Sequence, residues 1–236
     1  MSKEVEKANT PEQEENPRVL YIEDNFRAEF ARKLIHFISL AFPVIYFFTS
    51  RKLAIQILLP LTLVILFLDI AKNYHRPSAE IFYRTFAYIL RRYERIPEMR
   101  RLNGITSFLL AASISTIAFP KYVTIMSFVL MTFSDAASAL VGRRYGITKI
   151  MGRSLEGSLA FVITAVLVVL ITPKIEYRLG EYLICSLAAV VGAVAEILSG
   201  DTINDNFTIP LSIGAALWLF YYLIYPSMDI TLFGAI

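Results

Sequence analysis

The chain of 236 residues lacks what several familiar kinds of site require. It has one cysteine, Cys185, so no disulfide can form within the chain. Its two histidines and one cysteine form no zinc-type cluster. Neither P-loop spacing nor the residue order of a serine hydrolase occurs. The pattern of a cleavable signal peptide is also missing.

Apolar residues, in contrast, are abundant and fall in long blocks. They make up 56% of the chain, and the mean hydropathy is +0.55, too apolar for an ordinary soluble domain. A membrane-spanning helix needs roughly 20 apolar residues. We therefore predict an all-α fold, a polytopic integral membrane helical bundle with about seven transmembrane helices in one catalytic domain, residues 27–236. The predicted spans are approximately 34–50, 53–71, 104–119, 122–142, 158–172, 180–198 and 208–226.

Two segments outside these spans have a different character. Residues 1–26 form a predicted disordered acidic tail, since the first 17 are polar and bury almost nothing. The segment 77–97 lies between two prolines, and its aromatic residues recur at helical spacing among arginines. This pattern favours an amphipathic helix at the cytosolic membrane interface, although a connector packed on the bundle would explain it too.

Basic residues are distributed unevenly between the two sides. The connections 72–103 and 143–157 carry most of the loop Lys and Arg, which predicts that they and the N-terminus are cytosolic. Seven spans then place the C-terminus outside. Every polar cluster falls on the cytosolic side, whereas outer segments such as 41–48 and 163–171 are nearly bare of polar residues. This asymmetry favours an enzyme fed by a cytosolic solute over a transporter.

The first of these polar clusters surrounds Asp135. This carboxylate lies inside the predicted fourth span, where a charge is costly unless it is paired, hydrated or metal-bound. Small residues follow it up to Gly142, and they let another helix or a phosphate chain approach closely. Helix packing around one hydrogen-bonded Asp is the alternative. We interpret Asp135 as a catalytic residue and metal ligand.

The second cluster, residues 149–158, opens the predicted fifth span. Basic, hydroxyl and glycine residues at a helix start suit a phosphate, because backbone N–H groups and the helix dipole favour an anion. The alternative is an ordinary helix cap at Ser154. Glu156 is a candidate metal ligand or proton acceptor. The predicted phosphate-binding residues here are Lys149, Arg153, Ser154, Gly157 and Ser158.

The third cluster holds three carboxylates and two asparagines between residues 196 and 206. Such hard oxygen ligands suit Mg²⁺, which takes one or two protein carboxylates together with nucleotide phosphates. A solvated turn would explain the asparagines but not Glu196, which lies deeper in an apolar span. We predict Glu196, Asp201 and Asp205 as metal ligands, Asp205 also as catalytic, and Asn206 as a nucleotide contact.

The fourth cluster begins the first span. Arg32 and Lys33 are predicted to anchor the span and to contact phosphate, with Arg143 assisting from the connection after the fourth span. His36, one turn further in, is a candidate phosphate contact or proton shuttle. A hydrogen bond from His36 to a neighbouring helix is the alternative.

Together these clusters resemble the family of polyprenol or dolichol kinases, phytol kinases and CTP-dependent diacylglycerol kinases. The family motifs are Arg-Lys-x-x-His, Gly-Asp-x-x-Ala-x-x-x-Gly, Ser-x-Glu-Gly-Ser and Asp-Asn-x-Thr-Ile-Pro-Leu. They match here, in order, Arg32 to His36, Ser134 to Gly142, Ser154 to Ser158 and Asp205 to Leu211, so the resemblance covers about residues 27–226. Three positions depart from the family pattern: Ser134 replaces a usual Gly, Arg153 a common Lys, and Asn204 a frequent Asp.

The resemblance implies transfer of the terminal phosphate of CTP, or of another nucleoside triphosphate, to a lipid alcohol such as diacylglycerol or a polyprenol. Mg²⁺ is the expected cofactor, and the expected partners are nucleotide and membrane lipids, with no nucleic acid. The small-residue helix faces would permit a homodimer. The alternative is a cytidylyltransferase that makes a CDP-lipid from phosphatidate, and a transporter is less favoured.

Overall fold

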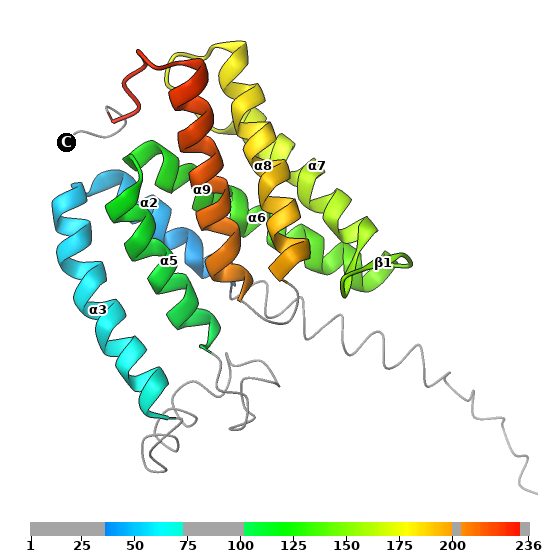
Figure 1. Ribbon diagram of the computed structural model, residues 1–236, viewed down its shortest axis with the longest axis horizontal. Helices are drawn as coiled ribbons and strands as arrows, with labels where there is room; N and C mark the ends of the chain where they lie inside the picture. Colours follow the sequence, from blue (N-terminus) through cyan, green and yellow to red (C-terminus); the bar gives the residue numbers. More distant parts are fainter. Residues whose placement is uncertain (1–35, 73–101, 200–203, 232–236) are drawn as a thin grey trace, which may run out of the picture.

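Helices dominate the computed structural model, which describes residues 36–72, 102–199 and 204–231 (Figure 1). Within these residues one β-hairpin is the only strand pair, and it was missed by the all-α prediction. The elements in order are η1 (Phe37–Leu40), α2 (Ala41–Phe48), α3 (Arg51–Ala71), α5 (Gly104–Ala118), α6 (Lys121–Tyr145), β1 (Lys149–Ile150), β2 (Arg153–Ser154), α7 (Leu155–Ile171), α8 (Leu179–Ser199) and α9 (Asp205–Ile224).

Polar caps explain why α3, α7 and α9 begin two or three residues before the predicted spans. Asn103 caps α5 by accepting hydrogen bonds from two backbone N–H groups with its side-chain oxygen, and Ser154 accepts one from Gly157 at the start of α7. Ser50 and Asn204 cap α3 and α9 in the same way. Hydropathy marks only the apolar part of a helix, whereas a cap satisfies backbone N–H groups in the polar flank and extends the helix there.

Seven apolar segments fold as helices, but they differ in length. By length and composition α3, α6, α8 and α9 can cross a membrane. The η1–α2 segment (Phe37–Phe48), α5 and α7 are shorter. At 1.5 Å per residue the 17 residues of α7 extend only about 25 Å, against roughly 30 Å of bilayer hydrocarbon. The fold is that of an all-α membrane protein, with four helices of full spanning length among the described residues.

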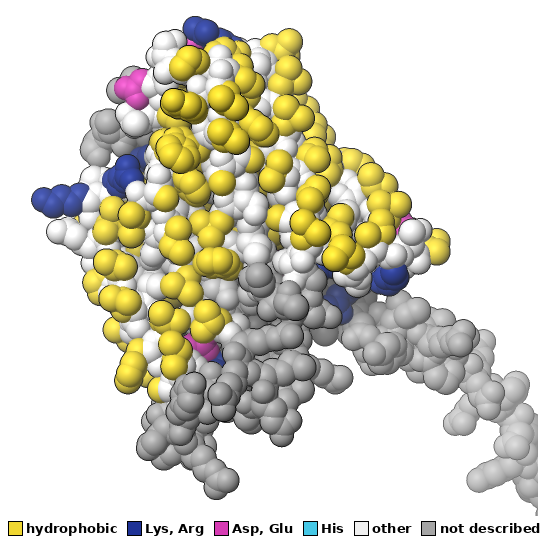
Figure 2. Space-filling view, in the orientation of Figure 1, with side chains coloured by type: hydrophobic (Ala, Val, Ile, Leu, Met, Phe, Trp, Pro, Cys, Tyr) yellow, Lys and Arg dark blue, Asp and Glu magenta, His cyan; other side chains and the backbone are white. Residues whose placement is uncertain are grey.

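Helix α6 forms the centre of the bundle. It packs against α7, α9 and the η1–α2 segment. In its most apolar stretch 61% of the residues are buried, compared with 17% in α3. Side chains such as Phe128, Leu130 and Met131 are fully buried in the core. The outer helices present apolar side chains to their surroundings, and Figure 2 shows these covering most of one face. Such an extended apolar surface is unfavourable in water and therefore suits a lipid environment.

Polar side chains tie the helices together at the end opposite the predicted site. The Lys121 ammonium group donates hydrogen bonds to the carbonyl oxygens of Phe47 (2.9 Å) and Thr49 (2.8 Å), and so joins α6 to the end of α2. Arg51 likewise donates to the carbonyl of Thr116, which joins α3 to α5. These bonds satisfy helix-terminal carbonyls that have no partner within their own helix.

Several predictions concern residues outside the described part of the chain. They are the acidic tail 1–26, the interfacial helix 77–97, the phosphate contacts Arg32 and Lys33, and the metal ligand Asp201.

Candidate active site

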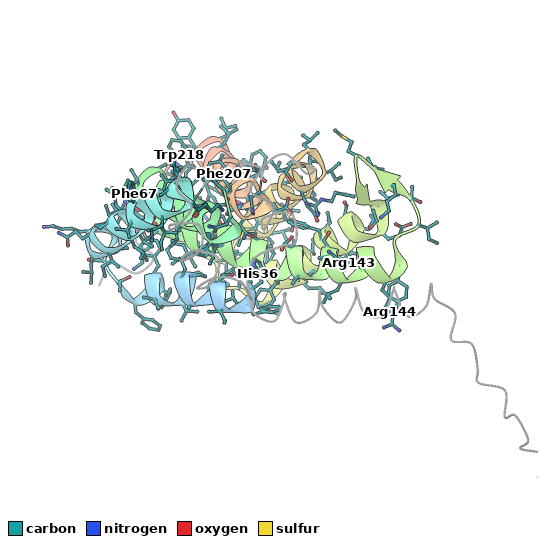
Figure 3. The ribbon with its side chains drawn as sticks, turned by 90° about the horizontal axis from the view of Figure 1, so that it is seen from below. His36, Phe67, Arg143, Arg144, Phe207 and Trp218 are labelled. Atoms are coloured by element: carbon teal, nitrogen blue, oxygen red, sulfur yellow. The ribbon has the colours of Figure 1, made fainter. Side chains whose placement is uncertain are left out.

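Asp135 and His36 lie side by side. The sequence predicts both on the same side of the membrane. Asp135 is on α6, buried to 4% exposure, and His36 immediately precedes η1 (Figure 3). One oxygen of the Asp135 carboxylate is 3.6 Å from Nε2 of His36. The antiparallel packing of η1 on α6 continues through the edge-on contact of Phe37 with Phe133. The imidazole is therefore held beside a carboxylate that can stabilise its protonated form.

Glu196 reaches the same region from α8. The hydroxyl of Ser138, one turn beyond Asp135 on α6, donates a hydrogen bond of 2.6 Å to Oε1 of Glu196. Glu196 is only 1% exposed, and its second oxygen has no hydrogen-bond partner in the described part of the chain. A buried carboxylate oxygen without a donor is costly, and it would be compensated by a proton or a cation.

Arg153 of β2 forms an ion pair with Asp205, the first residue of α9. The other oxygen of Asp205 accepts a hydrogen bond of 2.7 Å from Ser199 at the end of α8. Burial lowers the pKa of Arg153, but the charges of Asp205, Glu196 and Asp135 outweigh this and raise it above its ordinary value. The guanidinium is therefore permanently charged and lies in the field of all three carboxylates.

The cluster of Asp135, Glu196, Asp205 and Arg153 carries an excess of negative charge. Three carboxylates face one guanidinium, and the fifth group, His36, adds charge only when it is protonated. In the described residues no three His, Cys, Asp or Glu side chains are close enough to form a metal site by themselves. Mg²⁺ nevertheless fits, because it typically uses one or two carboxylates and completes its shell with phosphate and water. Asp135 and Glu196, with its unpartnered oxygen, match that requirement.

Glu156 has a local structural partner. Its Oε1 accepts a hydrogen bond of 3.0 Å from the backbone N–H of Thr148, just before β1. Hydrogen bonds from backbone N–H groups, first its own and then that of Thr148, lower the pKa of Glu156. Glu156 thus ties the start of the hairpin to the start of α7, and a low pKa makes it a weak proton acceptor.

The small residues of two predicted motifs meet where α6 crosses α7. A methyl group added to Gly157 would lie 2.8 Å from the carbonyl oxygen of Ser138 and 3.2 Å from Cα of Gly142. One added to Gly142 would lie 2.6 Å from Oγ of Ser154. The glycines thus allow a close helix crossing, which places Ser154 against α6. Ser154 also caps α7, and Ser158 donates to the carbonyl of Ser154.

The remaining predicted contacts lie around this centre. Asn206 donates a hydrogen bond of 3.1 Å from its side-chain amide to the carbonyl of Gly104, which links the starts of α9 and α5. Lys149 is exposed on the hairpin, and Arg143 is exposed near the end of α6 (Figure 3). The phosphate-binding roles of Asn206, Lys149, Arg143, Ser154, Gly157 and Ser158 remain predictions.

Sequence reasoning missed two buried polar groups near the described helix ends. Asp69 forms an ion pair with Lys72 at the end of α3, and it accepts a hydrogen bond from the backbone N–H of Asn103. Their spacing of three residues at a helix end was the available signal. These groups extend the polar end of the bundle from α9 and α5 to α3.

At the opposite end of the bundle, Glu181 is fully buried and accepts hydrogen bonds from the backbone of Ile175, Glu176 and Arg178. Lys174, also buried, donates to the carbonyls of Val169 and Thr172. Burial lowers the pKa of Lys174. A buried polar group thus also occurs at the end opposite the clusters that the sequence predicts to be cytosolic. Its hydrogen bonds go to the adjacent loop and hold that loop in place.

The sequence is similar to those of several known proteins. The chain is 29% identical over 208 residues to CTP-dependent diacylglycerol kinase 1 of Saccharomyces cerevisiae, covering 78% of this chain and 70% of that protein. It is 24% identical over 153 residues to the protein of the same name from Schizosaccharomyces pombe, covering 58% and 69%. The chain is a distant homologue of CTP-dependent diacylglycerol kinases.

This homology supports the family resemblance drawn from the motifs, as far as CTP-dependent lipid kinases are concerned. An uncharacterized protein of Rickettsia prowazekii, RP860, is 28% identical over 205 residues, which cover 85% of this chain and 98% of that one. No protein-family model matches the chain. No solved structure matches it either.

Proposed function

We propose that this protein is a membrane-embedded lipid kinase that transfers the terminal phosphate of CTP to the hydroxyl group of a lipid alcohol, such as diacylglycerol or a polyprenol. The observation that carries the proposal is the cluster of three buried carboxylates, Asp135, Glu196 and Asp205, with the half-buried Arg153 at one end of an apolar bundle. Four separate elements contribute to it. The distant homology to CTP-dependent diacylglycerol kinases supports the choice of donor and of lipid acceptor.

Asp135 and Glu196 would hold Mg²⁺ on the nucleotide. When bound, the ion would neutralise charge on the phosphates of CTP. The unpartnered oxygen of Glu196 supports this role, and so does the proximity of Asp135 and Arg153 to it. Of the other two predicted ligands, Asp201 lies outside the described residues and Asp205 is paired with Arg153.

Arg153 would bind the terminal phosphate of CTP. A guanidinium can donate two parallel hydrogen bonds to a phosphate, which suits transfer through a loose transition state stabilised by charge. Without nucleotide, Asp205 holds this side chain in place, and Ser199 holds Asp205. Exchange of one anionic partner for another keeps the guanidinium paired, while Asp205 keeps the hydrogen bond from Ser199.

His36 would take the proton of the lipid hydroxyl. The hydroxyl oxygen forms a bond to the terminal phosphorus, the bond from that phosphorus to the bridging oxygen breaks, and CDP leaves. His36 is favoured over Glu156 because its imidazole lies 3.6 Å from Asp135, whereas Glu156 accepts a backbone hydrogen bond at the hairpin. The protonated imidazole would be stabilised by the Asp135 carboxylate.

The proposed orientation follows from the distribution of charge along the chain. The polar end of the bundle would face the cytosol, where CTP is available, and the chain would cross the membrane several times. The cluster of basic residues near the ends of α3 and α6 supports this side as cytosolic. The lipid would enter sideways between helices.

The experiment that tests the proposed function compares CTP labelled at the γ-phosphate with CTP labelled at the α-phosphate. The purified protein in detergent micelles would receive Mg²⁺ and, separately, diacylglycerol, a polyprenol or phosphatidate. A kinase places γ-label and no α-label in one lipid alcohol, which also identifies the acceptor. Incorporation of α-label into phosphatidate, with release of pyrophosphate, would instead show a cytidylyltransferase. No label in any lipid would contradict both enzymatic readings.

A further inference from the structure

The segment Tyr145–Met151, called here the hairpin tip, leaves its apolar side chains uncovered by the described part of the chain. Ile147 is 88% exposed, Met151 64% and Tyr145 60%. Tyr145 is the last residue of α6 and the other two lie beyond it, so the bundle itself does not bury these side chains. Four apolar residues within seven positions, counting the partly exposed Ile150, form an unusual surface for a loop in water.

Cations accompany these apolar residues. Arg143 and Arg144 lie in the last turn of α6, Lys149 begins β1, and all three are exposed. No acidic residue occurs between Val141 and Leu155. The guanidinium of Arg144 lies 5.6 Å from the centre of the Tyr145 ring, and Figure 3 shows it directed away from the bundle. Apolar and basic side chains mixed on one surface complement an anionic lipid interface, which offers hydrocarbon and negative headgroups together.

The backbone of the turn adds a third observation. Met151 and Gly152, between the two strands, both have positive φ angles, of 48° and 86°. Such a turn favours Gly, Asn or Asp, because a longer side chain in the left-handed region costs free energy. Gly152 satisfies the rule and Met151 does not. The turn therefore does not explain the large apolar side chain of Met151, whereas contact with an apolar surface outside the chain would.

We propose that the hairpin tip docks on anionic lipid headgroups at the membrane surface, with Ile147, Met151 and Tyr145 in the interface and Arg144 and Lys149 on lipid phosphates. The strand register gives this contact a role. Ile150 pairs with Arg153 across the hairpin, so lipid contacts on one strand fix the position of the guanidinium on the other. The proposal does not depend on the kinase activity.

The test measures the depth of a spin label attached at the tip. The label is placed by Ile147→Cys in a chain carrying Cys185→Ala, and the protein is reconstituted in nanodiscs of phosphatidylcholine with or without phosphatidylglycerol. Collisions with oxygen report lipid, and collisions with a water-soluble nickel complex report water. Glu176→Cys, in the exposed loop at the other end of the bundle, provides the aqueous reference.

We expect the label at position 147 to collide several-fold more with oxygen than with nickel, and more so with phosphatidylglycerol. Adding Arg144→Gln and Lys149→Gln should remove the phosphatidylglycerol effect, whereas Lys52→Gln, a matched exposed charge near the start of α3, should not. Nickel access equal to that at position 176 would overturn the proposal. So would protection from both reagents, which would show a protein partner, or an oxygen preference unaffected by phosphatidylglycerol.

A second probe avoids the change at buried Cys185. Ile147→Trp in a chain carrying Trp218→Phe gives one fluorophore at the tip. Lipids brominated near the headgroup should quench its fluorescence more than lipids brominated at the chain ends. Equal and weak quenching by both would contradict docking.

Discussion

Arg153 shows how one side chain can join the hairpin to the buried cluster. It is carried by a strand of two residues, yet its guanidinium reaches Asp205 at the start of α9. The family that the sequence resembles commonly has a lysine at this position. A lysine would retain the charge but not the two-pronged hydrogen-bond geometry.

We therefore predict that Arg153→Lys raises the KM for CTP about 10-fold, in line with the loss of one charge-assisted hydrogen bond, and changes kcat less. Steady-state kinetics of phosphate transfer measure both constants. Arg144→Lys is the matched control, since this exposed residue points away from the bundle (Figure 3). An unchanged KM in Arg153→Lys would remove Arg153 from the nucleotide site.

Glu156 gives a prediction about pH. Its pKa in the folded protein is lowered, so the charged carboxylate stabilises the folded state above its ordinary pKa, about 4.3. That contribution is lost as the pH falls through the folded-state pKa. Glu156→Gln should lower the midpoint of thermal unfolding at pH 7, and the difference from the unchanged protein should disappear in acid.

Thermal unfolding in detergent between neutral and acidic pH checks this result. Glu176→Gln is the control, because Glu176 forms an exposed ion pair with Arg178, and such pairs contribute little. A difference for Glu156→Gln that stays constant over the whole pH range would show that the charge is not involved.

The sequence pointed to the buried carboxylates of the candidate site, but not to their partners. Asp135, Glu196 and Asp205 were recognisable because a carboxylate in or beside an apolar helix needs compensation. The pairing of Asp205 with Arg153 was not predictable, since it joins segments 52 positions apart and depends on the hairpin. Hydropathy contains no information about a contact of that kind.

At the scale of helices, the close crossing of α6 and α7 determines the positions of the side chains that form the site. Gly157 on α7 faces the backbone of Ser138 and Gly142 on α6. Ser138 holds Glu196. A wider crossing would therefore move the hydroxyl that orients this carboxylate.

Gly157→Ala should destabilise the folded protein by about 1–3 kcal/mol, the usual cost of overpacking, because its methyl group would meet a carbonyl oxygen at 2.8 Å. Denaturation in mixed micelles measures the loss. Leu159→Ala, a 54% exposed position on the same helix, should cost much less. Equal stability of Gly157→Ala and the unchanged protein would show that the helices can separate freely.

Sequence patterns located the helices and missed the hairpin for one physical reason. A span of apolar residues is a strong and repetitive signal, whereas strands of two residues contain too few positions to show alternation. The positive φ angle of Met151 adds to the difficulty, because methionine is not a usual turn residue. The capping residues Ser50, Ser154 and Asn204 would have corrected the predicted starts of α3, α7 and α9.

For the whole molecule, the short helix α7 raises the question of how the chain crosses the membrane. The charge distribution predicts that the loops on either side of α7 lie on opposite faces, although α7 is shorter than the bilayer is thick. Cysteines introduced by Lys149→Cys and Glu176→Cys, each in a chain carrying Cys185→Ala, report the two loops.

In right-side-out vesicles, a membrane-impermeant maleimide should label the cysteine at position 176 directly. It should label the cysteine at position 149 only after the membrane is permeabilised. Labelling of both positions from the outside would show that α7 does not cross, and the predicted count of seven spans would be wrong.

The most direct test of the central claim, that the buried cluster performs phosphate transfer from CTP, is the turnover of Asp135→Asn with γ-labelled CTP and the preferred lipid alcohol. The account predicts a loss of about 100-fold or more, because the charge that holds the nucleotide's counter-ion and orients His36 is removed. The unfolding midpoint should remain close to that of the unchanged protein. Asp229→Asn, an exposed carboxylate at the other end of the bundle, should transfer label normally. Full activity in Asp135→Asn would contradict the account.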